Sequence, residues 1–191
     1  MYVHPGKRLA YLSNPKTASL STAEALLLRG FVPVTSPAGM ETAAWRASKP
    51  SRIEHHRTLS RHPGAGWNVA CAVRNHWDAW LSWYFYAGRP TVRFDAAWMR
   101  GFHARFEQTY FPLPGRMWGL QEAFADTVLR YEVLESDLAR WVGAPVELEV
   151  VNASGARGGR ARFELYDEDA REYVASTFGA EIARFGYAFL W

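Results

Sequence analysis

The residues of this sequence best suited to chemistry are one lysine and four hydroxyl side chains that lie close together near its start. They belong to the stretch Lys16, Thr17, Ala18, Ser19, Leu20, Ser21 and Thr22. An ammonium group and several hydroxyls offer a compact positive charge and hydrogen-bond donors, which together suit a phosphate or sulfate group. Lysine occurs only three times in the chain, whereas arginine accounts for the other nineteen basic residues, so Lys16 is an unusual choice for its loop.

A strand and a helix are expected to position this loop. The apolar run 9–12 suits a buried strand, and Pro15 ends it. Leu20, Ala23 and Leu26 then recur at helical spacing. Because a helix start presents unpaired N–H groups and the positive end of its dipole, we predict an anion site here. The alternative is an ordinary group of capping residues with a surface lysine.

A second basic residue, Arg74, follows another apolar run. Residues 67–73 show no polar alternation, which is typical of a central parallel strand covered on both faces. An amphipathic helix follows, and Ser82 lies on it, eight residues after Arg74 and off its apolar stripe. A guanidinium fork and a hydroxyl could bind one phosphate together. The alternative role for Arg74 is a surface salt bridge.

Two further groups lie in irregular stretches. His55 and His56 fall in a crossover rich in Pro, Ser, Gly, Arg and His over 36–66, and a histidine there could act as a general base. Arg157 and Arg160 fall in the Gly- and Arg-rich run 152–162, where they could close over an anion. Solvent-exposed loop residues are the alternative for both pairs.

The remaining patterns predict strands that alternate with helices. Strands are expected over 31–34, 126–131 and 146–151, and helices over 95–108, 118–125, 135–142 and 166–185. This order predicts an α/β fold in which helices flank a central, mostly parallel sheet, with ligands bound outside the carboxyl ends of the strands. The Lys16 loop and Arg74 both lie at such ends.

Length and composition narrow the classes of protein. The 191 residues fit a single domain spanning 1–191, and the net charge of +3 permits an anionic ligand without requiring nucleic acid. The single cysteine, Cys71, excludes an internal disulfide and a cysteine-rich zinc site. No metal site is expected. No segment has the length of a membrane span and no signal peptide is recognisable, so a cytoplasmic protein is expected.

Five segments resemble the sulfotransferases that use 3′-phosphoadenosine 5′-phosphosulfate (PAPS), most closely their carbohydrate-type branch, similar to sulfotransferase family 2. They are P-K-T-A-S-L-S, A-V-R-N-H-W-D-A-W-L-S-W-Y, L-R-Y-E-V-L-E-S-D, V-N-A-S and Y-D-E-D-A-R-E-Y-V with F-G-Y-A-F. The resemblance covers most of the chain and implies a P-loop-NTPase-like sulfotransferase fold. It implies transfer of a sulfuryl group to a hydroxyl of a carbohydrate or other metabolite.

The resemblance also implies roles for residues. The 5′-phosphosulfate would be bound by Lys16, Thr17, Ala18, Ser19 and Ser21, and the 3′-phosphate by Arg74 and Ser82. Lys16 would stabilise charge on the bridging oxygen, His56 or else His55 would be the base, and Arg157 and Arg160 would reach the cofactor.

The loop departs from the family pattern at two positions. Ser19 stands where glycine is usual and Leu20 where a small hydroxyl residue is usual, so Ser21 or Thr22 would have to supply the missing contact. Two other functions stay open: a small kinase-like phosphotransferase, and an inactive module that binds nucleotides or nucleic acid. The sequence leaves the acceptor unnamed, and a homo-oligomer that completes the acceptor cleft is one possibility.

Overall fold

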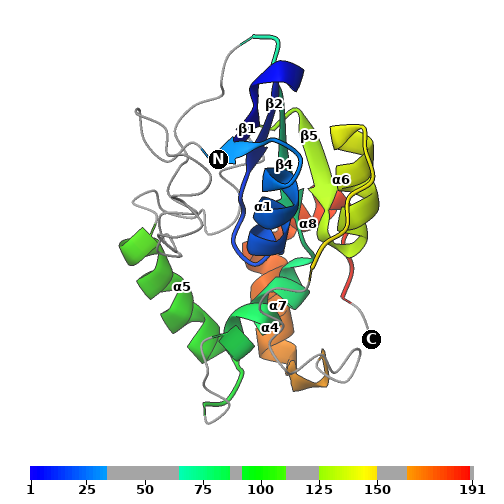
Figure 1. Cartoon of the computed structure of the whole chain (residues 1–191). Coiled ribbons are helices and arrows are strands. Elements are labelled where there is room, and N and C mark those ends of the chain that lie inside the picture. The colour runs from blue at the N-terminus through cyan, green and yellow to red at the C-terminus, as the bar shows by residue number, and fades with distance from the viewer. Residues whose placement is uncertain (34–64, 87–91, 111–124, 150–162, 190–191) are drawn as a thin grey trace. The chain divides into compact units, whose positions relative to one another are not determined.

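The computed structural model describes residues 1–33, 65–86, 92–110, 125–149 and 163–189, with side chains of 106–110 excepted (Figure 1). The chain divides into two compact units. Unit 1 comprises Met1–Val73 and Trp118–Val151, and unit 2 comprises Arg74–Met117 and Asn152–Trp191. Each is described by itself, and the single sulfotransferase-like domain expected over 1–191 stays a prediction.

Unit 1 is built on a sheet whose described strands are five in number, in the order β3-β1-β2-β4-β5. Their bounds are Tyr2–His4 for β1, Leu9–Leu12 for β2, Val32–Pro33 for β3, Asn68–Val73 for β4 and Thr127–Arg130 for β5. Strands β2, β4 and β5 run parallel, with Leu12 opposite Cys71 and Cys71 opposite Val128. Strand β1 pairs antiparallel with both β2 and β3.

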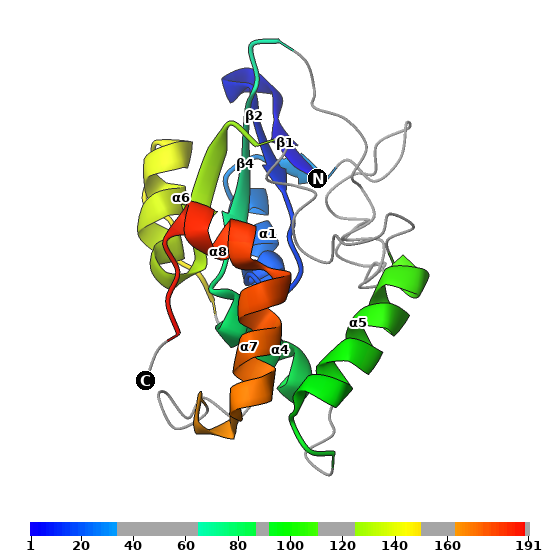
Figure 2. The same ribbon diagram turned by 180° about the vertical axis from the view of Figure 1, so that it is seen from behind.

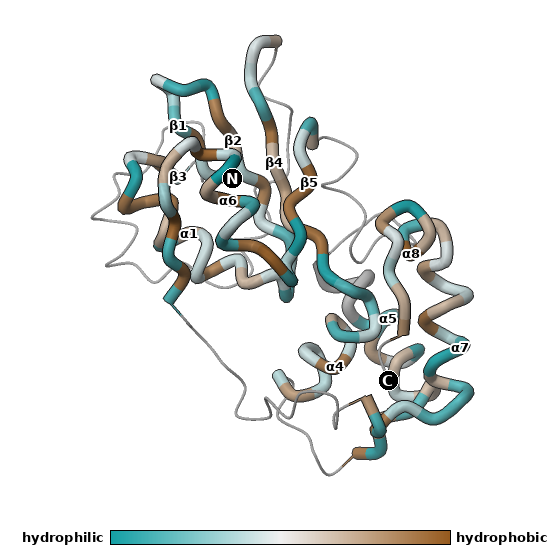
Figure 3. Tube along the Cα trace, turned by 90° about the vertical axis from the view of Figure 1, so that its right-hand side faces the viewer, coloured by the Kyte–Doolittle hydropathy of each residue, from teal (hydrophilic) through white to brown (hydrophobic). Residues whose placement is uncertain are grey.

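Helices α1 (Ser19–Leu27) and α6 (Leu134–Val142) contribute to the same hydrophobic core of unit 1. Alternate residues of β4, Ala70 and Ala72, lie in that core together with Leu26 and Leu138. Figure 1 shows α1 in front of the strands, and Figure 3 shows hydrophobic colouring along β4 and β5. Because β4 is buried along most of its length, an uninterrupted apolar sequence is needed there.

Short turns and caps close unit 1. The 3-10 turns Pro5–Lys7 and Tyr131–Val133 precede β2 and α6. Gly143 ends α6 in a left-handed conformation, with φ of 74°. The ammonium group of Lys7 donates to the carbonyl of Val142 at 2.9 Å, where a positive charge complements the helix dipole.

Unit 2 is helical in its described residues (Figure 2). Its helices are α4 (His76–Tyr86), α5 (Ala96–Tyr110), α7 (Glu168–Thr177) and α8 (Gly179–Phe185). Helix α7 packs against both α4 and α5. Asn75 caps α4 and Asp95 caps α5, through backbone N–H groups of Trp77 and Trp98 at 3.1 and 2.8 Å.

Several predicted elements are confirmed, and others differ. The sheet is mixed rather than mostly parallel as predicted. Strand β1, which the sequence analysis did not predict, adds two antiparallel pairings. No strand forms over 146–149, where the N–H of Leu148 is bonded at 2.8 Å by the carboxylate of Glu135 instead of a neighbouring strand. The helix expected over 166–185 is two helices that meet at Phe178. The predicted helix over 118–125 lies almost wholly outside the described residues.

Candidate anion-binding loop

The loop after β2 is fastened to the neighbouring strand. The side-chain amide of Asn14 is buried and donates to the carbonyl of Ala72 in β4 at 2.8 Å. The hydroxyl of Thr17 donates to the carbonyl of Asn14, also at 2.8 Å, which closes the turn. The predicted loop therefore starts at the carboxyl end of one parallel strand and is held to the end of the next.

Two residues of the loop adopt backbone conformations that L-amino acids rarely take. Lys16 has a φ of 62° and Ala18 a φ of 56°, both in the left-handed region. For a residue other than glycine, this conformation lowers the stability of the fold by about 1–3 kcal/mol. Left-handed residues next to right-handed ones turn successive N–H groups toward one side, an arrangement known to bind anions. The strain is therefore concentrated on either side of Thr17.

Ala18 is also the N-cap of α1, and it makes no capping hydrogen bond with its side chain. The methyl side chain of alanine has no hydrogen-bonding group, so it cannot itself satisfy the N–H groups of the first turn. The helix runs for nine residues and its dipole adds a partial positive charge here. An anion placed at this turn would accept N–H groups and stand next to Lys16.

The predicted loop residues are divided between the turn, which holds Lys16 and Thr17 and ends at the N-cap Ala18, and the start of α1, which begins at Ser19. Thr17, Ser19, Ser21 and Thr22 are buried, whereas Lys16, Ala18 and Leu20 are half-buried. The left-handed positions are Lys16 and Ala18 rather than Ser19, which is the first residue of α1. Serine in place of the family's usual glycine thus meets no left-handed backbone at position 19.

Among the hydroxyls of this loop lies the buried phenol of Tyr11, which the sequence analysis did not single out. The side chain of Tyr11 in β2 is fully buried, as is that of Thr22 in α1. Burial raises the pKa of the Tyr11 phenol above its usual range, while the hydroxyls of Thr22 and Thr17 act in the opposite direction. The two threonines therefore lie next to the phenol oxygen.

In unit 2, Arg74 is buried and forms an ion pair with Asp78, one helical turn further along the chain. Its Nε donates to Asp78 Oδ2 at 2.6 Å. The sequence analysis gave a surface salt bridge as the alternative role of Arg74, and the observed salt bridge is buried. A guanidinium has five N–H donors, and the bonds to Asp78 Oδ2 use only some of them. Ser82 lies half-buried on α4.

Lys16 and Arg74 belong to different units, so their joint action on one ligand stays a prediction. His55, His56, Arg157 and Arg160 lie outside the described residues. Asn14 is a site residue that the sequence analysis missed, although an Asn-Pro pair after a strand is a known signal for a turn.

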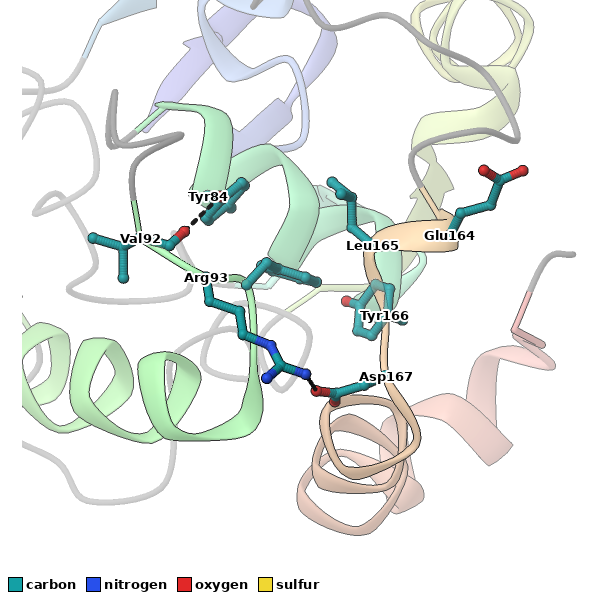
Figure 4. Close-up of a pocket in the computed structure, with 8 residues that line it drawn as sticks. Tyr84, Val92, Arg93, Glu164, Leu165, Tyr166 and Asp167 are labelled. Atoms are coloured by element: carbon teal, nitrogen blue, oxygen red, sulfur yellow. Dashed lines mark hydrogen bonds and ion pairs between the residues drawn. The ribbon is translucent and has the colours of Figure 1, made fainter.

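Unit 2 also contains an open hollow of about 390 Å³ (Figure 4). Its rim carries the ion pair between Arg93 and Asp167 at 3.1 Å, and its wall includes the hydroxyl of Tyr84, which donates to the carbonyl of Val92. Exposed aliphatic groups of Val92 and Leu165 are also part of the lining. None of the predicted site residues that the structure describes lines it.

The described ranges contain no group of three or more His, Cys, Asp or Glu side chains that could hold a metal ion. Within the same ranges, every helix is too short or too polar to traverse a lipid bilayer.

Comparison with known proteins gives no relative. No family model, no curated protein and no solved structure matches this chain.

Proposed function

We propose that this chain is a PAPS-dependent sulfotransferase that transfers a sulfuryl group to a hydroxyl of a carbohydrate or other metabolite. The observation that carries the proposal is the loop after β2, where left-handed backbone at Lys16 and Ala18 leads into a helix start whose N-cap is alanine. The resemblance of five sequence segments to that family supports the identity of the ligand.

The loop suits a phosphosulfate because its two kinds of donor act on different parts of the group. Backbone N–H groups at the start of α1 would hold the 5′-phosphate oxygens, as helix N-termini hold phosphate elsewhere. The ammonium group of Lys16, a half-buried residue three positions before the start of α1, would neutralise charge on the oxygen that bridges phosphorus and sulfur. Hydroxyls of Thr17, Ser19, Ser21 and Thr22 are the nearby side-chain donors.

In this reaction the bound cofactor supplies the sulfuryl group and leaves as 3′-phosphoadenosine 5′-phosphate (PAP). The acceptor oxygen forms a bond to sulfur, the bond from sulfur to the bridging oxygen breaks, and a base removes the acceptor proton. His56, with His55 as the reserve, is proposed for that base because an imidazole titrates near neutral pH. Sulfuryl transfer resembles phosphoryl transfer in depending on alignment and charge neutralisation.

The 3′-phosphate is assigned to Arg74 and Ser82, with Arg157 and Arg160 as further contacts. Support for Arg74 comes from chain continuity: it directly follows β4, the strand that lies parallel to β2. Asp78 would hold one edge of the guanidinium and so orient the other donors.

Titration calorimetry with PAP in the absence of magnesium tests the proposal. The wild-type chain is expected to bind, and Lys16→Ala is expected to weaken binding by about 10- to 100-fold, the range for a charge-assisted hydrogen bond. Arg140→Gln is the control, because it removes one positive charge from an exposed position of α6 in the same unit.

Three outcomes would contradict the proposal. Preference for ATP with magnesium would indicate a kinase-like phosphotransferase. Strongly salt-dependent binding of oligonucleotides would indicate a nucleic-acid-binding module. Equal loss of PAP affinity in Lys16→Ala and Arg140→Gln would show that the loop is not the binding site.

A further inference from the structure

We propose that Tyr11 is a positioning residue of the Lys16–Thr22 loop and acts through the hydroxyls of Thr17 and Thr22. The inference deepens the proposed function and rests on it for the identity of the ligand. Tyr11 lies in a strand, five positions before Lys16, and the family resemblance assigns no role to it.

The phenol hydroxyl of Tyr11 needs an explanation that its ring does not. The ring belongs to the core of unit 1 and lies 6.4 Å from that of Trp141, a place that phenylalanine would fill equally well. The hydroxyl is fully buried, and a buried hydroxyl is unfavourable unless it is bonded. In the described structure neither it nor the hydroxyl of Thr22 makes a hydrogen bond of full geometry.

The neighbouring threonines identify the direction of the missing bond. Thr17 and Thr22 are the side-chain hydroxyls that act on the Tyr11 phenol. The proton of Thr17 is already committed to the carbonyl of Asn14 at 2.8 Å, so Thr17 can only accept from Tyr11. Tyr11 is therefore the donor toward Thr17, and because the phenol has a single proton, Thr22 is the donor toward the phenol oxygen.

In this arrangement the Tyr11 phenol restrains the backbone of the loop. Thr17 stands between Lys16 and Ala18, the two residues with left-handed backbone. Fixing its side chain from below, through Asn14 on one side and Tyr11 on the other, fixes the peptide groups that flank it. Those peptide groups lead directly into the start of α1, whose N–H groups the proposed function assigns to the phosphate.

Tyr11→Phe in the full-length chain tests the inference, since it removes the hydroxyl and keeps the ring. Tyr2→Phe is the matched control: Tyr2 is opposite Tyr11 in the pairing of β1 with β2 and is also buried. Thr22→Val is the second variant, because it removes the other hydroxyl without changing the side-chain shape.

The first measurement needs no ligand. Amide hydrogen exchange at Thr17–Ser21 is expected to become about 2- to 10-fold faster in Tyr11→Phe and Thr22→Val, the range for one lost hydrogen bond, while exchange in α6 stays unchanged. The double variant is expected to resemble Tyr11→Phe, because removing the phenol hydroxyl already removes its interaction with Thr22.

The second measurement compares two ligands. Tyr11→Phe is expected to weaken PAP binding by the same factor and to leave binding of adenosine 3′-monophosphate, which lacks the 5′-phosphate, unchanged. A variant that merely loosened the fold would weaken both.

Unchanged loop exchange in Tyr11→Phe and Thr22→Val, or an equal change in Tyr2→Phe, would overturn the inference. Failure of the wild-type chain to bind PAP would instead overturn the proposed function, and the exchange measurement would still decide the role of Tyr11.

Discussion

The side-chain amide of Asn14 donates to the carbonyl of Ala72 at 2.8 Å, and this bond joins the end of β2 to β4 inside a buried site. It spans 58 residues of sequence and fastens the loop to the sheet. The carbonyl of Ala72 would be left without this donor if the amide were removed.

Asn14→Ala is therefore expected to lower the free energy of unfolding by about 1–3 kcal/mol, the cost of a buried hydrogen bond lost on one side. PAP affinity is expected to fall with it. Asn68→Ala, at the other end of β4, is the control: it removes exposed bonds to Thr127 and Trp141 and should leave PAP affinity unchanged. Urea unfolding and calorimetry measure the two effects, and equal loss of affinity in both variants would contradict the role of Asn14.

Ala18→Gly is expected to stabilise the chain by about 1 kcal/mol, because glycine adopts the left-handed φ of 56° without strain. Ala139→Gly, inside α6, is the control and should destabilise by about 1 kcal/mol. Thermal unfolding measures both. If Ala18→Gly were as destabilising as its control, the left-handed conformation at this position would be wrong.

His76 predicts a pH dependence in unit 2. Its ring stacks on Phe178 at 5.0 Å, and burial lowers its pKa from 6.5 to about 4. Below pH 6.5 the unfolded chain takes up a proton that the folded chain does not, so stability is full above pH 6.5 and falls as the pH drops toward 4. The slope is at most about 1.4 kcal/mol per pH unit. His76→Phe keeps the stacking and should flatten this slope in urea titrations between those pH values; an unchanged slope would exclude His76 as its source.

The buried pair Arg74–Asp78 and the exposed pair Arg140–Asp137 allow a direct comparison. Asp78→Asn is expected to destabilise by about 3–5 kcal/mol, because it leaves a buried guanidinium without its charge partner. Asp137→Asn should cost about 1 kcal/mol or less for its ion pair. The double variant Arg74→Gln/Asp78→Asn should be less destabilised than Asp78→Asn; additive losses would show that the two side chains do not interact.

The parts of the fold that could be predicted from sequence are those with local causes. The apolar runs predicted β2, β4 and β5 to within a residue or two, and helical spacing with capping residues predicted α1, α4 and α6. Strand β1 was not predicted because three residues are too few to show a period. The single helix expected over 166–185 was wrong because an unbroken apolar pattern does not reveal the break at Phe178.

The site was predictable in its residues but not in its geometry. Lys16 and the hydroxyls stood out by type and spacing. The left-handed backbone at Lys16 and Ala18 did not, because glycine is the usual signal and is absent from both positions. Asn14 reaches a strand 58 residues away, and such a partner is set by the pairing of β2 with β4 rather than by any local pattern.

Cys71 gives the chain a built-in reporter. It is the sole cysteine in the sequence, lies fully buried in β4, and is flanked in the sheet by Leu12 and Val128. Because strand side chains project from the faces of a sheet, a thiol reagent can reach it only when the groups packed over β4 move away. The rate of its alkylation therefore reports how often β4 is uncovered, and a ligand that binds the adjoining turn should slow that rate.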